Sequence, residues 1–597
     1  MTAPSPRTDS DGAVHVVVTS DENPLPGSAQ LLSLEIHRAV NAVPYARLTL
    51  MDGDMFGKDF PVSDTDFFKP GAQIQVDAGY GSGRELLFKG LVVRHGLQVR
   101  GDNEARLVVE CRDEAVRMTV GRRNANHLAQ TDSAIIASLA HAAGLQAQVE
   151  ATSLQYTELA QHYCSDWDFM LARAEANGLL VIVDDGVISV KPPVVDADAV
   201  LSVTYGQDLI DFSADIDART QYASAQAVAW DPKTQAAVLG AAAGPASLNA
   251  QGDIDSATLA KVIGLASLRM QSGAPLAKEA LTTWAKAQQL KAGLARVRGR
   301  MRFQGSAKAR VGKLVELAGM GARFSGTVYL SGVHHEIADG NWITEAEFGL
   351  APAWFVERPD VRAPAAAGLL PGVEGLQVGV VLKLDGDPDG EHRIQVSVPV
   401  LQAERAGVWA RLAQLHGSDG IGSFFVPEIG DEVVLGYFGN DPSHPVVLGS
   451  LYSSKRTPPY ALAAANNTKA FVTRCKSRIE FDEQDKVITI TTPGANKIVI
   501  SDADKSISLK DQNGNEVKLA PAGITLDSPK DIQLTAKGRI VLDAVGTLSL
   551  ASKADVTAAG LNVECEAQVG YSAKGGASAE LSAAGQTVVK GALVMIN

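Results

Sequence analysis

Cysteine is scarce in this chain. Its 597 residues include four cysteines, which lie far apart and match no CxxC or Cys/His spacing: Cys111, Cys164, Cys475 and Cys565. This distribution excludes a dense disulfide framework and argues against a structural zinc site. It is typical of a protein made in a reducing cytoplasm.

Long apolar runs are missing as well. No stretch approaches the roughly eighteen consecutive apolar residues of a membrane-spanning helix. Residues 1–20 lack a basic segment and contain only a short apolar run at 14–18, so we expect no secretory signal. We therefore expect cytoplasmic synthesis, and a dedicated machine if the protein leaves the cell.

Positive charge is in deficit. The net charge is -14 at pH 7, and residues 471–597 carry 14 basic and 15 acidic side chains, so about -13 belongs to residues 1–470. A negative surface repels nucleic acid and anionic membranes. We expect no nucleic-acid partner and only mechanical contact with a membrane.

Aromatic residues nearly vanish toward the C-terminus. The last fifth of the chain contains no tryptophan and only Phe471, Phe481 and Tyr571. Asp527 and Asp543 could be posed as the carboxylate pair of a glycosidase, but such sites also need aromatic platforms for the sugar. We therefore interpret both aspartates as solvated strand ends and expect no catalysis.

The segment 471–597 does contain a fixed apolar period. Apolar residues recur every eight positions, at Ile524, Ile532, Ile540, Leu548 and Val556. Each has an apolar or small partner two positions on: Leu526, Leu534, Leu542, Leu550 and Ala558. Residues at i and i+2 share one face of a strand, and a fixed period indicates a solenoid. The pattern favours a three-sided β-prism with an interior of stacked Ile, Leu and Val.

Two alternatives stay open for this segment. An antiparallel meander would need regular hairpin turns, and Asn513-Gly514 is the only Asn-Gly pair present. The period also does not say whether one chain winds all three sides or three chains supply one side each. With strands about 4.8 Å apart, one chain would make a stub of roughly 25 Å and three chains a needle of roughly 75 Å.

The first half of the chain alternates between strand and helix patterns. Short apolar strands punctuated by Gly, Pro, Asp and Asn predict a barrel or sandwich over 14–123. Start and stop signals predict helices over 133–143, 165–178 and 275–294. Strands return over 313–348.

An internal echo links the two strand regions. The segment Phe88-Lys89-Gly90-Leu91-Val92 resembles Phe324-Ser325-Gly326-Thr327-Val328, and each has another glycine six positions after its own. Coincidence is the alternative, because glycine is common between strands. If the echo is real, residues 1–357 hold two similar barrels with inserted helices, and three chains would present six similar barrels to a sixfold ring.

A compact five-strand pattern follows a Pro- and Gly-rich linker at 358–375. The five strands fall within residues 376–456, which fits a small barrel of the OB type. A second linker, 457–470, joins this unit to the periodic segment.

Metal sites find little support in the sequence. Asp385, Asp387 and Asp389 imitate the start of an EF-hand loop, but Val396 occupies the position of the required bidentate Glu. The His-His-Glu tripeptide at 334–336 could suggest a metal, yet neighbours on a strand point to opposite faces. We expect no metal and no cofactor.

A set of motifs runs through the five-strand unit: His392-Arg393-Ile394-Gln395-Val396, Val408-Trp409-Ala410-Arg411-Leu412, Gly422-Ser423-Phe424-Phe425-Val426-Pro427, Ile429-Gly430-Asp431-Glu432-Val433-Val434 and Asn440-Asp441-Pro442. Two more lie outside it: Ser165-Asp166-Trp167-Asp168-Phe169 and Gly591-Ala592-Leu593-Val594-Met595-Ile596-Asn597. In this order the motifs resemble the VgrG spike family, which is similar to the hub and spike of contractile phage tails.

The resemblance implies a mainly β homotrimer. Its parts would be a two-barrel hub with inserted helices over 1–357, an OB-fold neck over 376–456 and a triple-stranded β-helix needle over 471–597. The implied partners are an inner tube protein and baseplate components at the hub, a PAAR-type tip protein at the needle end, and effector cargo. The platform for the tip protein would be the C-terminal residues Leu593, Val594, Met595, Ile596 and Asn597.

We therefore expect a structural hub and spike at the tip of a contractile injection machine, not an enzyme. About twenty residues separate the OB unit from the needle, which leaves no room for an inserted lysozyme domain, and the sequence ends without a fused effector. The alternative is a tail-fibre-like receptor-binding or polysaccharide-degrading protein, which exposed aromatic rows would favour. The residues do not distinguish type VI secretion from an extracellular or phage-derived particle, which would carry the protein outside or into a target cell.

Overall fold

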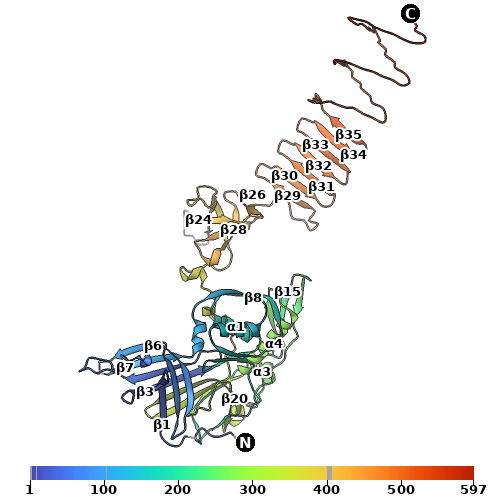
Figure 1. The fold of residues 1–597 in the computed structure, drawn as a ribbon. Helices are drawn as coiled ribbons and strands as arrows, with labels where there is room; N and C mark the ends of the chain where they lie inside the picture. Colours follow the sequence, from blue (N-terminus) through green and yellow to red (C-terminus); the bar gives the residue numbers. More distant parts are fainter. Residues whose placement is uncertain (1–2, 9, 102–103, 400–406, 597) are drawn as a thin grey trace. The chain divides into compact units, whose positions relative to one another are not determined.

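The computed structural model describes residues 3–8, 10–101, 104–399 and 407–596 of the chain (Figure 1). The chain divides into two compact units, Met1–Leu451 and Tyr452–Asn597. Strands dominate both units, which confirms the predicted mainly β class. All helices of the described residues lie in the first unit.

A thirteen-stranded sheet organises the first unit. One half consists of β1 (Val14–Ser20), β2 (Asn23–Pro24), β3 (Gln30–Ala39), β4 (Tyr45–Met51), β5 (Gln73–Tyr80), β6 (Glu85–Val99) and β7 (Ala105–Arg112). The other half consists of β13 (Leu201–Thr204), β14 (Leu209–Ile216), β18 (Val297–Gln304), β19 (Leu314–Ala318), β20 (Gly326–Ala338) and β21 (Asn341–Phe348). The main strand order is β14-β18-β21-β20-β3-β4-β7-β6-β5-β1-β2, and β19 also pairs with β20 and with β13.

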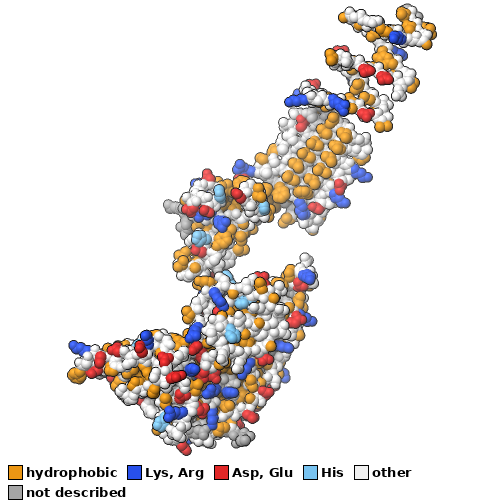
Figure 2. Space-filling model, viewed as in Figure 1, with side chains coloured by type: hydrophobic (Ala, Val, Ile, Leu, Met, Phe, Trp, Pro, Cys, Tyr) orange, Lys and Arg blue, Asp and Glu red, His pale blue; other side chains and the backbone are white. Residues whose placement is uncertain are grey.

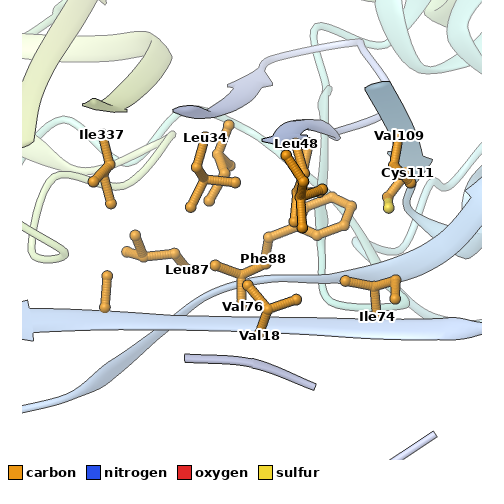
Figure 3. Packing of buried hydrophobic residues seen from close by; sticks show 14 of the residues in the cluster. Val18, Leu34, Leu48, Ile74, Val76, Leu87, Phe88, Val109, Cys111 and Ile337 are labelled. Carbon is orange, nitrogen blue, oxygen red and sulfur yellow. The ribbon is translucent and has the colours of Figure 1, made fainter. Parts of the chain in front are cut away.

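Each half of this sheet has its own apolar core. In the first half, Leu34, Leu48, Ile74 and Phe88 are fully buried on four different strands, and Ile337 of β20 joins the same cluster (Figure 3). Large side chains fill the second core in the same way: Met301, Phe303, Leu330 and Phe348. Full burial of one such side chain contributes about 1.5–3 kcal/mol. The two cores therefore stabilise two halves of one sheet.

The sequence echo falls on equivalent strands of the two halves. Strand β6 pairs first with β5 and then with β7, and β20 pairs first with β19 and then with β21. A Cβ at Gly90 would collide with the carbonyl oxygen of Arg112, and one at Gly326 with that of Ala250. Both glycines thus allow a close approach of two backbones. Antiparallel pairing of β3 with β20 joins the halves into one sheet, so neither closes as a separate barrel within the described residues.

The predicted helices are present in the first unit. Helix α1 (Asp132–Ala142) is capped by Thr131, and α2 (Asp166–Ala176) by Ser165, whose hydroxyl accepts the backbone N–H of Asp168. Trp167, Phe169 and Met170 of α2 enter a third core with residues of α1. The long helix α4 (Lys278–Leu294) begins slightly later than predicted.

Several elements between the helices were not predicted. They are the two-stranded antiparallel sheet of β8 (Arg123–Thr131) and β10 (Gln155–Cys164), the short β9 (Gln146–Val149), the sheet of β15 (Ala225–Asp231), β16 (Ala236–Leu239) and β17 (Leu268–Ser272), and α3 (Ser256–Ile263). The strands β11 (Leu180–Asp184) and β12 (Val187–Lys191) form a hairpin. The missed strands are alanine-rich or largely exposed, so their periodicity is weak.

A closed five-stranded barrel follows, as the OB pattern predicts. It consists of β22 (Gln377–Lys383), β23 (Ile394–Ser397), β24 (Val408–Leu412), β28 (Pro445–Ser450) and β27 (Glu432–Tyr437), in that spatial order. A small hairpin of β25 (Gly417–Ser418) and β26 (Ile421–Gly422) extends from it. Val381, Val396, Ala410, Leu435 and Val447 fill the barrel interior.

The second unit opens with a meander, which the sequence had not favoured. Seven five-residue strands pair in chain order and antiparallel: β29 (Thr468–Val472), β30 (Arg478–Asp482), β31 (Val487–Thr491), β32 (Lys497–Ser501), β33 (Ser506–Lys510), β34 (Glu516–Ala520) and β35 (Gly523–Asp527). Residues 528–596 continue as an open coil without strand pairing inside the described chain (Figure 1). The predicted β-helix therefore does not cover all of residues 471–597. Only residues 528–596, which follow the meander, remain as its candidate segment.

A buried charge cluster ties α1 to α2. The carboxylate of Asp132 is 1% exposed and accepts hydrogen bonds from Arg173 Nε at 2.6 Å and Nη2 at 3.0 Å. Asn177 Nδ2 donates to it at 2.7 Å and the Tyr156 hydroxyl at 3.2 Å. Each partner compensates part of the cost of removing the carboxylate from water.

We expect Asp132→Ala to destabilise the hub by about 3–5 kcal/mol, because it leaves Arg173 as a buried, uncompensated charge. Calorimetric unfolding of the full-length protein measures this loss. Replacing both partners by apolar residues, Asp132→Leu with Arg173→Met, should lose much less. Arg219→Ala, which removes an exposed ion pair with Asp217, is the control and should change stability far less than Asp132→Ala, because solvent screens this pair. Equal losses in the buried and exposed variants would contradict the prediction.

Candidate functional site: an apolar sheet face and an apolar tip

One face of the meander carries two parallel rows of apolar side chains. The strand register places directly opposite one another, across all seven strands, Phe471, Ile479, Ile490, Ile498, Leu509, Val517 and Leu526. The second row runs beside it: Phe481, Ile488, Ile500, Ile507, Leu519 and Ile524. We call these thirteen residues the apolar face.

The apolar face is uncovered in the single chain. Ile498 near its centre is 37% exposed and Ile524 at its upper end 74%. Figure 2 shows these side chains as continuous orange rows over β29–β35. A contiguous apolar surface of this kind marks a protein–protein interface in a soluble protein. The meander is therefore one wall of a larger assembly.

The turns of the meander explain why the sequence did not favour it. In the three turns at one edge, the backbone N–H of Lys476, Ala495 and Gly514 donates back to the residue three positions earlier. All three adopt positive φ, and so do Lys486 and Lys505 in two turns at the other edge. Three-residue hairpin loops require one left-handed residue. Glycine occupies that position in only one of these five turns, so the usual hairpin signal was missing.

The octads of residues 528–596 are also uncovered. Ile532, Leu534, Ile540 and Leu542 are all more than half exposed. No backbone-to-backbone hydrogen bond forms among the described residues of this segment. Extended strands need neighbours for their N–H and C=O groups. Of the two windings left open by the sequence, these unpaired strands fit the one in which other copies supply the neighbouring strands.

The predicted tip platform lies at the end of this segment. Leu593, Val594, Met595 and Ile596 are 79%, 49%, 78% and 91% exposed, and Asn597 lies outside the described residues. These four consecutive exposed side chains form a small apolar surface at the end of the segment. Its role as a binding platform stays a prediction.

The acidic loop of the OB barrel is organised around a guanidinium. Asp387 accepts hydrogen bonds from Arg393 Nε at 3.0 Å and Nη2 at 2.6 Å, and from the backbone N–H of Glu391 at 2.8 Å. Arg393 holds the pKa of Asp387 far below its usual value. The positive charge that an EF-hand would take from calcium is supplied here by a side chain, as expected for a turn between strands.

The His-His-Glu tripeptide spans two faces of β20. His335 is buried, contacts Thr344 Oγ1 at 2.9 Å through Nδ1, and burial lowers its pKa to about 3. His334 lies on the other face, opposite His37 of β3. No cluster of three potential metal ligands occurs among the described residues. His335 is therefore a neutral core residue.

Asp527 and Asp543, the carboxylates considered as a glycosidase pair, do not line a common cavity. Asp527 lines a hollow of about 540 Å³ over β31–β35, whose lining includes residues of the apolar face, and Asp543 is not part of that lining. The hollow is an uncovered part of the wall, without an aromatic residue in its lining.

A second cavity, of about 500 Å³, lies in the hub between α2, α4 and residues 350–359. Its lining includes Leu180, Leu290 and Trp354. The Glu175 carboxylate there forms an ion pair with Lys291 and accepts the backbone N–H of Phe355 at 2.6 Å. Both charged groups are committed to structural contacts. No helix of the described chain is long and apolar enough to cross a bilayer.

Comparison with known families agrees with this geometry. A family model described as the Alg8 N-terminal domain matches residues 10–339, more than half of the chain. The chain belongs to this family. Two further models match the rest: the type VI secretion system/phage-baseplate injector OB domain at 377–452 and the phage baseplate V C-terminal trimerisation domain at 487–594. Strands β31–β35 of the meander and the coil up to residue 594 therefore lie in the region that matches a trimerisation domain.

Several of the similar proteins are named as spike proteins. The type VI secretion system spike protein VgrG1b of Pseudomonas aeruginosa is 28% identical over 186 residues, which cover 28% of this chain and 24% of that protein. The spike protein VgrG3 of Vibrio cholerae is 30% identical over 99 residues, covering 15% and 10%. These matches confirm the resemblance to VgrG spikes. The chain spans about a quarter or less of the length of these relatives.

A solved structure is similar over a larger region. It is an E. coli component of the type VI secretion system, reported to resemble the T4 tail proteins gp27 and gp5. The identity is 12%, the TM-score is 0.39, and the alignment covers 73% of this chain and 99% of that chain.

We expect Ile498→Asp to abolish trimer formation, because it places a charge in the middle of the apolar face. Val499→Asp is the matched control, since the adjacent residue of the same strand points to the opposite face. Size-exclusion chromatography with light scattering distinguishes monomer from trimer. If the two variants assembled equally well, the apolar face would not be the trimer interface.

Proposed function

We propose that three copies of this chain form the structural hub and spike at the tip of a contractile injection machine. The hub, residues 1–357, would join the inner tube and baseplate, and the OB barrel would form a neck. The trimerised C-terminal segment would be the membrane-piercing needle. The observation that carries this proposal is the apolar face of thirteen residues, followed by a coil that forms no backbone-to-backbone hydrogen bond within the described chain.

A needle made in this way is suited to transmit force. When three copies supply neighbouring strands, every strand edge is paired and every octad contributes Ile, Leu or Val to a continuous core. Such a rod yields only when many hydrogen bonds and apolar contacts break together. The sheath of the machine would supply the force, and the chain would contribute stiffness.

The proposed partners would bind at two places, the hub and the C-terminal tip. An inner tube protein and baseplate components would bind the hub. A PAAR-type tip protein would sit on Leu593, Val594, Met595, Ile596 and Asn597, whose apolar side chains are suited to a small hydrophobic cap. Effector cargo would travel on the tip. The assembled particle would carry the protein outside the cell or into a target cell.

The chain itself would not be an enzyme. The charged groups of its hub cavity are engaged in structural contacts, and the posed carboxylate pair of the shaft shares no cavity. The competing function, a fibre that binds a receptor or degrades polysaccharide, would need aromatic rows on the outer surface. Phe471 and Phe481 instead lie in the two rows of the apolar face.

Cells that produce the machine test the proposal directly. We expect the wild-type chain and Val499→Asp to restore contraction-driven injection in a strain lacking this gene, and Ile498→Asp to fail because no trimer can seed the tip. Electron microscopy of purified particles should reveal a spike of threefold symmetry only in the active strains. Injection by particles that contain only monomeric chain would contradict the proposal.

Deletion of residues 593–597 tests the tip platform. We expect the truncated protein to remain trimeric, because the octads and the apolar face are intact, but to lose capture of the tip protein in a pull-down. Lys590→Ala, which changes a neighbouring charge and keeps the apolar end, should retain capture. Undiminished capture by the truncated protein would overturn the assignment of these residues.

A further inference from the structure

The meander has two edges that differ in the turns they contain. One edge, here called edge A, holds the turns β29–β30, β31–β32 and β33–β34; the other, edge B, holds the turns β30–β31, β32–β33 and β34–β35. Each strand is five residues long, so the two edges lie about 17 Å apart.

The two edges carry opposite charge. From β29 to β33, every charged residue on edge A is basic: Arg474, Lys476, Arg478, Lys497 and Lys510. Edge B at the same levels holds five acids: Asp482, Glu483, Asp485, Asp502 and Asp504. Lys486 and Lys505 reduce the charge of edge B but leave it negative. Farther along edge A, Asp511 caps its own turn by accepting the backbone N–H groups of Asn513 and Asn515.

Two lysines of edge A stand directly opposite each other. Lys497 and Lys510 are cross-strand partners at the ends of β32 and β33. Like charges in this arrangement destabilise a sheet. Neither lysine forms an ion pair within the described chain. Glu516, the partner of Lys510 on the next strand, β34, instead accepts a hydrogen bond from Ser508 at 2.8 Å, and Lys497 has no acidic partner across the strands. The sheet therefore keeps a repulsive pair at its edge.

We propose that edge A of each copy meets edge B of the next copy in the trimer, and that their opposite charges select this arrangement. The inference rests on the proposed trimeric spike. When identical walls surround a threefold axis that runs across their strands, each wall places one edge beside the opposite edge of its neighbour. The second copy of this chain is thus the partner that neutralises the lysine pair.

The heights of the charges along the sheet agree with this pairing. The threefold rotation does not shift a residue along the threefold axis. Residues at the same height along this axis therefore meet where two copies are in contact. Lys497 and Lys510 lie on β32 and β33, and Asp502 and Asp504 lie in the turn that joins these same two strands. One turn below on edge B, Glu483 and Asp485 follow β30, and Arg478 begins β30 on edge A.

The acids on edge B of the same chain cannot take this role. Lys497 and Asp502 lie at opposite ends of one strand, about 17 Å apart, which exceeds the screening length of about 8–10 Å in physiological salt. Exposed ion pairs contribute little to stability. Complementary charge mainly steers association and rejects wrong pairings. The edges therefore set the order and speed of assembly, and the apolar face holds the product together.

Charge reversal in the full-length chain tests the pairing. The double reversal is Lys497→Glu with Lys510→Glu. The fourfold variant adds Asp502→Lys and Asp504→Lys to it. Lys518→Glu is the matched control, because Lys518 is the central residue of β34 and lies on neither edge. The chains are dissociated in denaturant and diluted into 50 mM or 1 M salt, and light scattering follows trimer formation. Trimer yield on expression gives the same comparison without refolding.

We expect the double reversal to assemble about tenfold more slowly than Lys518→Glu at low salt, and the fourfold variant to return to within about twofold of wild type. In 1 M salt, where the screening length is about 3 Å, the difference should disappear. Assembly of the double reversal at the rate of Lys518→Glu, or no rescue in the fourfold variant, would overturn the inference. If the wild-type chain were not trimeric, the proposed function itself would fail.

Discussion

The second unit depends on one constraint: a single chain neither covers its apolar side chains nor pairs the strands of its coil. In the meander the backbone is satisfied within the sheet, and the apolar face is left uncovered. In residues 528–596, no backbone-to-backbone hydrogen bond forms among the described residues. Additional copies of the chain satisfy both needs at once, which is why a trimerisation domain matches this region. A chain organised in this way is complete only as an assembly.

The meander and the coil divide this task between them. A wall of seven paired strands can form in one chain and then associate through its face, as two sheets of a sandwich do. The coil can acquire strand neighbours only after the chains have been brought together. The order along the sequence, wall first and coil second, lets the wall align three chains before the coil must wind.

The first unit follows ordinary rules of globular folding. It contains several buried clusters, capped helices and a closed barrel, and its buried Asp132 is paired with Arg173. Its two sheet halves repeat the same long bent strand, with a glycine where two backbones approach closely. A sheet with two similar halves gives a threefold object six similar surfaces, which suits a hub that faces a sixfold ring.

Sequence patterns predicted the parts of this protein that rest on local chemistry. One helix was marked by Ser165 at its start and another by Gly144 at its end, the barrel by five short apolar strands, and the apolar tip by Leu593 to Ile596 at the end of an octad series. The meander was misjudged because Lys476, Lys486, Ala495 and Lys505 take positive φ in place of glycine. The alanine-rich strands β15 and β16 carried too little periodicity to be recognised.

The amino-acid sequence by itself determined the mainly β class, the octad period and the places where helices begin and end, because these depend on residues close together in the chain. Tertiary structure alone decided which strands become neighbours: the joining of β3 to β20, the alignment of thirteen apolar residues into two rows, and the separation of basic and acidic residues onto opposite edges. These features bring together residues that are distant in sequence, and only the register of paired strands places them side by side.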